Sequence, residues 1–339
     1  MRFGILRNYS VAVEPLALKW IKAVAISTAV AAALYLITAF WAGRLEVGAA
    51  LKMVSVDLIF GLLALSALNY GLRFLRWHYY IRRLGSGIAI HHNLRIYLGG
   101  FALTMTPGKA GEMARSLWLR PFGVPVAASV AAFLAERMQD FLAIVLLSSL
   151  GASMYRGGQW LLLFSLAFVL FSMLIIYVHA ISRRALQLMA LRSGSIRSLG
   201  LRIAQVLDFT RDCLTARRFI LGLVIGIGAW TAEAYAFALL LQALGQPLPL
   251  TTAIAIYALS MLAGAVSFMP GGLGGSEATM IVLLTLCKVP VASAVSATLL
   301  IRVTTLWFAV LLGILALSIR SKALAPAAVP AAPAPLDSR

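Results

Sequence analysis

Long apolar stretches dominate the chain, and six of them have about the length that crosses a lipid bilayer. A helix of about 20 apolar residues spans roughly 30 Å of hydrocarbon. The pattern therefore predicts an all-α, polytopic membrane protein with about six full transmembrane helices. The predicted spans are residues 20–42, 54–77, 125–149, 159–180, 219–243 and 292–318.

Two further apolar regions, at 92–121 and 252–288, are each interrupted near the middle by proline and glycine. Proline removes a backbone donor, and glycine allows turns that other side chains would block. We therefore expect each region to form a broken helical hairpin that returns to its starting side. The first has the short arms of a re-entrant loop, and the second is long enough for its arms to cross completely. The expected hinge residues are Pro107, Gly108, Gly111, Pro270, Gly271, Gly272, Gly274 and Gly275.

The second half of the chain repeats the first. The segments 124–147 and 289–312 are identical at 11 of 24 positions, and the alignment places Arg137 over Arg302. Each unit consists of a span, a broken hairpin and a span, covering about 54–149 and 219–318. Because their first spans lie three crossings apart, the units are predicted to be inverted repeats, a design typical of transporters. Biased apolar composition is the alternative explanation.

The distribution of charged residues predicts how the chain is oriented in the membrane. The chain has 29 Lys and Arg against 11 Asp and Glu, a formal charge of +18. Cytoplasmic loops of membrane proteins collect basic residues, and no nucleic-acid-binding motif is present. Basic residues gather before residue 23, in a turn at 73–95 and in a loop at 183–218. Both termini are therefore predicted to be cytoplasmic, with the first hairpin entering from inside and the second from outside.

The segments outside the spans complete the predicted organisation, in which 20–320 form a single transmembrane domain. Residues 1–19 are expected to be an uncleaved, cytoplasmic amphipathic lead-in. The loop at 182–218 is expected to contain an amphipathic helix at the inner surface. Residues 321–339, rich in Ala and Pro, are expected to be disordered. Two cysteines, Cys213 and Cys287, fall on opposite sides of the membrane in this topology, so no disulfide is expected.

Ionisable residues recur inside the apolar regions, where insertion costs roughly 2.5–3.5 kcal/mol each. Such groups face a cavity or a partner, and they are Asp57, Glu112, Glu136, Arg137, Asp140, Glu233, Glu277 and Arg302. One hypothesis is a polar cavity for a charged lipid headgroup, because arginine forks onto phosphate. The candidate phosphate partners are Lys109, Arg115, Arg137 and Arg302. Structural salt bridges between the repeats are the alternative, and the broken turns can serve either as anion sites or as packing turns.

Other kinds of chemistry find little support in the sequence. The four histidines have no Cys or clustered carboxylates at ligand spacing, so no metal site is predicted. Lys109 lacks the context of a P-loop, and no nucleophile elbow is present. We therefore expect no catalytic residue and no cofactor.

The motifs resemble those of the lysylphosphatidylglycerol synthase transmembrane-region family of flippase-like membrane proteins. The resemblance rests on TPGKAGE at 106–112, ERMQD at 136–140 and PGGLGGSE at 270–277, and it extends over about 20–320. In bifunctional members a cytosolic aminoacyl-transferase domain follows the flippase region. This chain has only an Ala- and Pro-rich tail there, so the resemblance implies lipid translocation without lysyl transfer.

The sequence and the resemblance together predict a lipid transporter of the bacterial inner membrane. Its expected substrate is an anionic or phosphate-bearing lipid: a phospholipid, an aminoacyl-phospholipid or a polyprenyl-phosphate-linked glycolipid. Transport would be passive or ion-coupled, with Glu112, Asp140, Glu233 and Glu277 as candidate proton carriers. The alternatives are a membrane-embedded lipid-modifying transferase and a scaffold that docks a glycosyltransferase through 182–218. A glycosyltransferase or lipid synthase partner and oligomerisation both remain open.

The predicted inversion can be tested by cysteine labelling in a variant that lacks Cys213 and Cys287. A membrane-impermeant reagent added from outside should modify a cysteine placed at Pro249 and should not modify one placed at His91, because the two hairpins begin on opposite faces. Reaction of both positions from the same side would contradict the inversion.

Overall fold

The computed structural model of the chain describes residues 53–151 and 195–319, together with single positions between 160 and 174. Within these residues every regular element is helical, which confirms the all-α fold class. Several predictions fall wholly or largely outside them and stay predictions: the lead-in at 1–19, the spans at 20–42 and 159–180, the first part of the loop at 182–218 and the tail at 321–339.

Four of the predicted spans correspond to long helices. Among the described residues, three helices are long and apolar enough to cross a membrane. These are α3, Val56–Arg83; α10, Ala216–Ala243; and the continuous run Val291–Ser318. The last consists of α13, Val291–Arg302, a π-helical turn η5, Val303–Trp307, and α14, Phe308–Ser318. The fourth, α6, Val126–Ser149, carries three charged residues in its middle.

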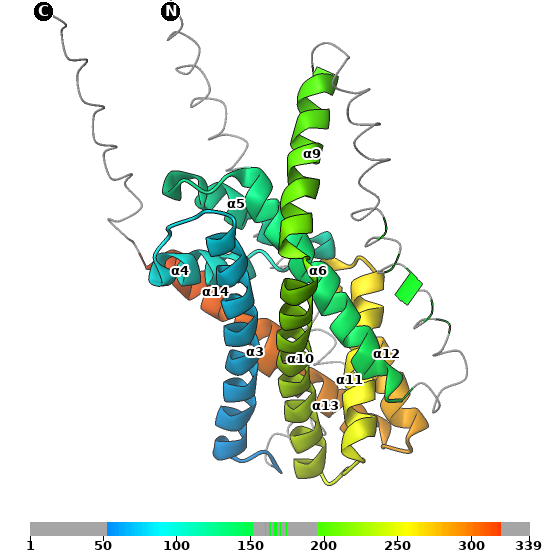
Figure 1. Cartoon of the computed structure of the whole chain (residues 1–339). Coiled ribbons are helices and arrows are strands. Elements are labelled where there is room, and N and C mark those ends of the chain that lie inside the picture. Colours follow the sequence, from blue (N-terminus) through cyan, green and yellow to red (C-terminus); the bar gives the residue numbers. More distant parts are fainter. Residues whose placement is uncertain are drawn as a thin grey trace, which may run out of the picture.

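Helices α3 and α10 lie side by side and run in opposite directions (Figure 1). The amide Nδ2 of Asn69 donates to the backbone oxygen of Ala229 at 2.8 Å. About two turns further along α3, Nη1 of Arg76 donates to the backbone oxygen of Gly222 at 3.1 Å. Residue numbers thus rise on one helix as they fall on the other, and polar side chains join the two helices in the buried interior.

Each region broken by proline and glycine forms a series of short helices. The first consists of α4, Ile90–Phe101, the 3-10 helix η1, Pro107–Ala114, α5, Arg115–Trp118, and η2, Arg120–Phe122. The second consists of α11, Leu250–Val266, η4, Pro270–Gly272, and α12, Gly275–Leu286. At 1.5 Å per residue even α11, with 17 residues, is only about 25 Å long, less than the roughly 30 Å of a hydrocarbon core.

The two broken turns pack against each other. Met105, fully buried just before η1, contacts Gly271 in η4, where a Cβ atom would lie 2.7 Å from the methionine sulfur. Gly271 also has a φ of +62°, which favours glycine. Leu306 and Val310 complete this small apolar cluster. The hinge segments of the two hairpins are therefore neighbours in space, and side chains from η5 and α14 cover them.

The remaining helices surround this centre. Helix α4 packs along α14, and α6 packs along α11. The helix expected within 182–218 is α9, Ser195–Cys213. It contacts α6, and Figure 1 shows it above α10 and nearly in line with it.

Gly313 makes the contact between α14 and the end of α4 possible, and this gives a test of the packing. A Cβ atom at Gly313 would lie 2.2 Å from the backbone nitrogen of Ala102, which cannot move aside as a side chain can. Gly313→Ala should therefore lower the stability by about 1–3 kcal/mol, measured as thermal unfolding in detergent. Gly61→Ala is the control, because no atom lies within 4 Å of its Cβ position. Equal melting temperatures for both variants would contradict the close approach of α4 and α14.

Candidate functional site

Seven charged residues form one network on α3, η1, α5 and α6, which we name the first charge cluster. Its members are Arg73, Arg76, Glu112, Arg115, Glu136, Arg137 and Asp140. All except Arg137 are at most 5% exposed, and the side chain of Arg137 is 23% exposed. Because an unpaired buried charge is very costly, the pairing within this network is central to the packing of these helices.

Asp140 is the hub of the first charge cluster. Its Oδ1 lies 2.5 Å from Nη2 of Arg76, and its Oδ2 lies 3.3 Å from Nη2 of Arg73 and 3.1 Å from Nη2 of Arg137. One turn earlier on α6, Oε1 of Glu136 lies 3.8 Å from the same Arg76 nitrogen. Three arginines thus share one aspartate, and two of them bind α3 to α6.

Arg115 is enclosed by aromatic rings. Its guanidinium carbon lies 4.4 Å from the ring centroid of Trp77, 4.7 Å from that of Tyr97 and 5.6 Å from that of Phe133. Its Nη2 lies 3.3 Å from Oε2 of Glu112. Cation–π contacts and the ion pair together compensate for the burial of this charge. Arg115 therefore holds the short helix α5 in place.

The structure corrects the sequence analysis for two arginines. The charge pattern places Arg73 and Arg76 in a cytoplasmic turn at 73–95, but α3 continues to Arg83 and both side chains are buried in the cluster. Their spacing of three residues, which places them on one face of a helix, is the signal that could have identified them. Asp57, predicted to be an intramembrane charge, is exposed in the first turn of α3.

A second charge cluster consists of the ion pair between Glu277 and Arg302, beside the second broken turn, and of Glu233, which lines the same cavity as Arg302. Oε1 of Glu277 lies 2.6 Å from Nε of Arg302, and its Oε2 accepts a hydrogen bond from the backbone N–H of Gly274 at 2.7 Å. Nη2 of Arg302 donates to the backbone oxygen of Gly271 at 3.0 Å. Glu277 thus caps α12 and also ties the turn to α13, so this ion pair lies within the second unit.

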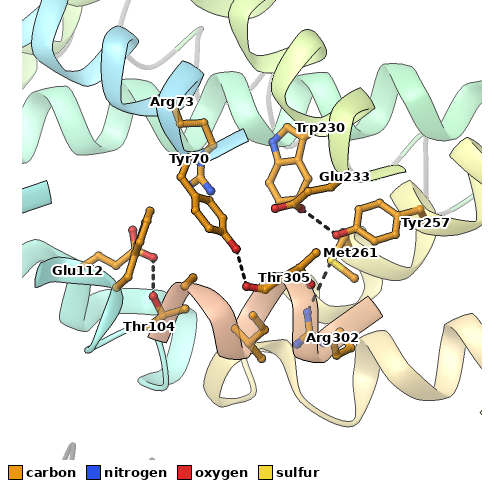
Figure 2. Close-up of a pocket in the computed structure, with 13 residues that line it drawn as sticks. Tyr70, Arg73, Thr104, Glu112, Trp230, Glu233, Tyr257, Met261, Arg302 and Thr305 are labelled. Atoms are coloured by element: carbon orange, nitrogen blue, oxygen red, sulfur yellow. Dashed lines mark hydrogen bonds between the residues drawn. The ribbon is translucent and has the colours of Figure 1, made fainter. Parts of the chain in front are cut away.

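A cavity of about 50 Å³ separates the two clusters. Figure 2 shows Arg73 and Glu112 on one side of it and Glu233 and Arg302 on the other. The hydroxyl of Tyr257 donates to Oε2 of Glu233 at 2.8 Å. Tyr70, Trp230 and Tyr257 also line this cavity, and none of them stands out in the sequence, because aromatic residues are common in apolar helices.

A larger pocket of about 330 Å³ adjoins the cavity. Arg137, Asp140 and Arg302 supply its charged wall, and the rest is mostly apolar side chains and glycines of α6, α11 and the second broken turn. Trp230 and Met261 line both spaces, as does Arg302. The pocket and the cavity therefore share a wall formed by these three residues, one of which is an arginine.

The predicted binding residues divide into three groups. Those that line a space are Glu112, Glu233 and Arg302 in the cavity, and Arg137, Asp140 and Arg302 in the pocket. Those that line neither and instead hold other charges are Arg115, Glu136 and Glu277. The side chain of Lys109 lies outside the described part of the structure.

The predicted hinge residues lie where the helices break. Pro107 begins η1, and Pro270 begins η4. Three hinge glycines have left-handed φ values: Gly271 at +62°, Gly272 at +71° and Gly274 at +82°. The hinges in the first region, by contrast, lie at the start of η1 or within it.

Comparison with known protein families gives a match over most of the chain. The model of the family described as the lysylphosphatidylglycerol synthase TM region matches residues 20–313, most of the chain. No curated protein was found to match.

The role of Asp140 as a hub predicts a large loss of stability when its charge is removed. Asp140→Asn leaves three arginines with less compensating charge in a buried site, which should cost about 3–5 kcal/mol in unfolding experiments in detergent. Asp57→Asn is the matched control, because Asp57 is exposed. If the two variants unfold at the same temperature, the ion pairs at Asp140 do not stabilise the fold.

Proposed function

Because the chain belongs to the lysylphosphatidylglycerol synthase TM-region family, we propose that it is a transporter of anionic or phosphate-bearing lipids. The observation that carries the proposal is the pocket of about 330 Å³, with two arginines and one aspartate, Asp140, in an otherwise mostly apolar wall. A phospholipid is divided in a similar way, because its headgroup carries a charged phosphate and its acyl chains are apolar. Arg137 and Arg302 would bind the phosphate through their planar guanidinium groups, while the apolar wall would contact the chains.

We further propose that the units 54–149 and 219–318 are inverted repeats that contribute to six spans and two re-entrant hairpins. Several observations support this. Helices α3 and α10 each have 28 residues, run antiparallel and are followed by a left-handed glycine, Gly85 or Gly245. The contact between Asn69 and Ala229 joins positions separated by 160 residues, the offset between the two helices. A pseudo-two-fold axis near this contact would relate the units.

The proposed orientation places both termini in the cytoplasm of a bacterium. Exposed Arg82 and Arg83 end α3, and exposed Arg217 begins α10. Because these helices are antiparallel, the three arginines lie at the same end of the molecule, as expected for a cytoplasmic face. Rocking of one unit against the other would open the wall of Trp230, Met261 and Arg302 and let a headgroup pass between pocket and cavity.

Transport of a fluorescent phosphatidylglycerol in proteoliposomes tests the proposal. Arg137→Lys and Arg302→Lys should each slow translocation about tenfold or more, because a lysine keeps the charge but loses the bidentate fork, a loss of roughly 1.5–3 kcal/mol. Arg82→Lys, at an exposed position, should transport as the wild type does. Full activity of both pocket variants would show that these arginines are not phosphate ligands, and an inactive wild type would overturn the proposed function.

A further inference from the structure

The larger pocket is too small to enclose a whole phospholipid. Its volume of about 330 Å³ lies at the lower end of the roughly 300–1,000 Å³ that enclose drug-sized ligands. A pocket of this size has room for a headgroup and for the beginning of the acyl chains. The rest of the two chains has to lie outside, so a bound lipid needs an opening through which its chains reach an apolar medium.

The exposed lining residues locate such an opening. Phe268 is 72% exposed and Met269 is 48% exposed, and both line the pocket. They lie in the turn between α11 and η4, and we name this pair the mouth of the pocket. The charged wall includes the partly exposed Arg137 and the buried Arg302. The pocket therefore combines an apolar mouth with one arginine near the surface and one in the interior.

The mouth lies within the length of the neighbouring long helix. Helix α11 follows α10 after a short connection and packs against it (Figure 1). At 1.5 Å per residue α11 is about 25 Å long and α10 is about 42 Å long. The turn after Val266 is thus well inside the ends of α10. At this depth in a membrane, exposed apolar side chains contact lipid hydrocarbon and not water.

The backbone at Phe268 is strained, although its ring gains little burial in return. Its φ of +52° is left-handed, which is rare for a bulky residue, and among the described residues other than glycine only Lys288 shares a positive φ. The hydroxyl of Ser267 supports the turn, because it donates to the backbone oxygen of Gly264 at 2.8 Å and accepts from the backbone N–H of Met269 at 3.3 Å. Strain of this kind is typical of functional sites.

We propose that the mouth is a lateral opening to the bilayer, where Phe268 and Met269 contact the acyl chains of a lipid whose headgroup lies in the pocket. The inference rests on the proposed function and deepens it, because it specifies the path of the lipid. The headgroup moves past Arg137 toward Arg302, while the chains stay in the membrane. The protein should then discriminate between headgroups and not between chain lengths.

Photocrosslinking in proteoliposomes of phosphatidylcholine tests where the chains lie. With p-benzoylphenylalanine in place of Phe268, irradiation should attach phosphatidylglycerol that carries an alkyne tag on its acyl chains. An excess of unlabelled phosphatidylglycerol should remove most of this adduct, whereas an equal excess of diacylglycerol, which has no phosphate, should not. Phe60 on α3 is the matched control position, because it is 67% exposed and lines neither space. Any adduct there comes from surrounding lipid and should not respond to either competitor.

A second variant separates contact with lipid from a structural role. Glycine adopts a positive φ without strain, and the ring that it replaces is mostly exposed, so Phe268→Gly should unfold in detergent at a temperature no lower than that of the wild type. Transport of fluorescent phosphatidylglycerol should nevertheless fall about fivefold, because the chains lose an aromatic contact at the mouth. Phe268→Leu keeps an apolar side chain and should retain more transport than Phe268→Gly. Phe60→Leu should transport as the wild type does.

The alternative results separate the two proposals. If the adduct at position 268 resists competition as the adduct at position 60 does, in a protein that transports phosphatidylglycerol, the lateral opening is wrong and the proposed function stands. Attachment to the headgroup in place of a chain, located by mass spectrometry, would also overturn the opening. A melting temperature of Phe268→Gly that falls together with its transport would reduce Phe268 to a structural residue. A wild type that neither transports phosphatidylglycerol nor shows competition would overturn the proposed function itself.

Discussion

A charge inside an apolar medium needs a partner, and this requirement organises the described part of the molecule. Ion pairs between Asp140 on α6 and both Arg73 and Arg76 on α3 hold these two helices together. Glu277 ties the second broken turn to Arg302 on α13. Lipid tails are as apolar as leucine, so hydrophobic burial alone discriminates poorly between alternative packings of such helices. The ion pairs and the close contacts at small residues supply that discrimination.

Under the proposed function, structural and ligand-facing roles would fall to different members of the same network. Arg115 is enclosed by three aromatic rings, and Glu136 is fully buried, so both hold other residues in place. Arg137 is the most exposed member of the first charge cluster and reaches the wall of the larger pocket. In the proposed site, the inner pairs would keep the shape while Arg137, paired with Asp140, would meet the anionic group.

The broken turns bring these parts together. Gly271 lets the second turn approach Met105 closely, and its carbonyl accepts a hydrogen bond from Arg302. A backbone carbonyl freed at a helix break is costly in a membrane unless it finds a donor. The same break that ends α11 therefore supplies a ligand for the arginine that both the pocket and the cavity share.

Local properties of the chain were enough to predict the long helices of the described residues. The expected span at 125–149 is α6 at Val126–Ser149, and the breaks after α4 and α11 fall beside the predicted prolines, because apolar length and proline act within one segment. The cavity could not be predicted from the sequence, because its lining depends on which helices face each other. The sequence alone suggests that Arg73 is a charge in a loop. Its partner, Asp140, lies on another helix, so the pairing is visible only in the tertiary structure. Glu112 and Glu277 look equivalent in the sequence, yet they pair differently. Glu112 lies 3.3 Å from Arg115, three residues away, and 3.9 Å from Arg137 on α6, whereas Glu277 lies 2.6 Å from Arg302 on α13. The pair with the aligned arginine thus recurs in both units, and only the first unit adds a local arginine.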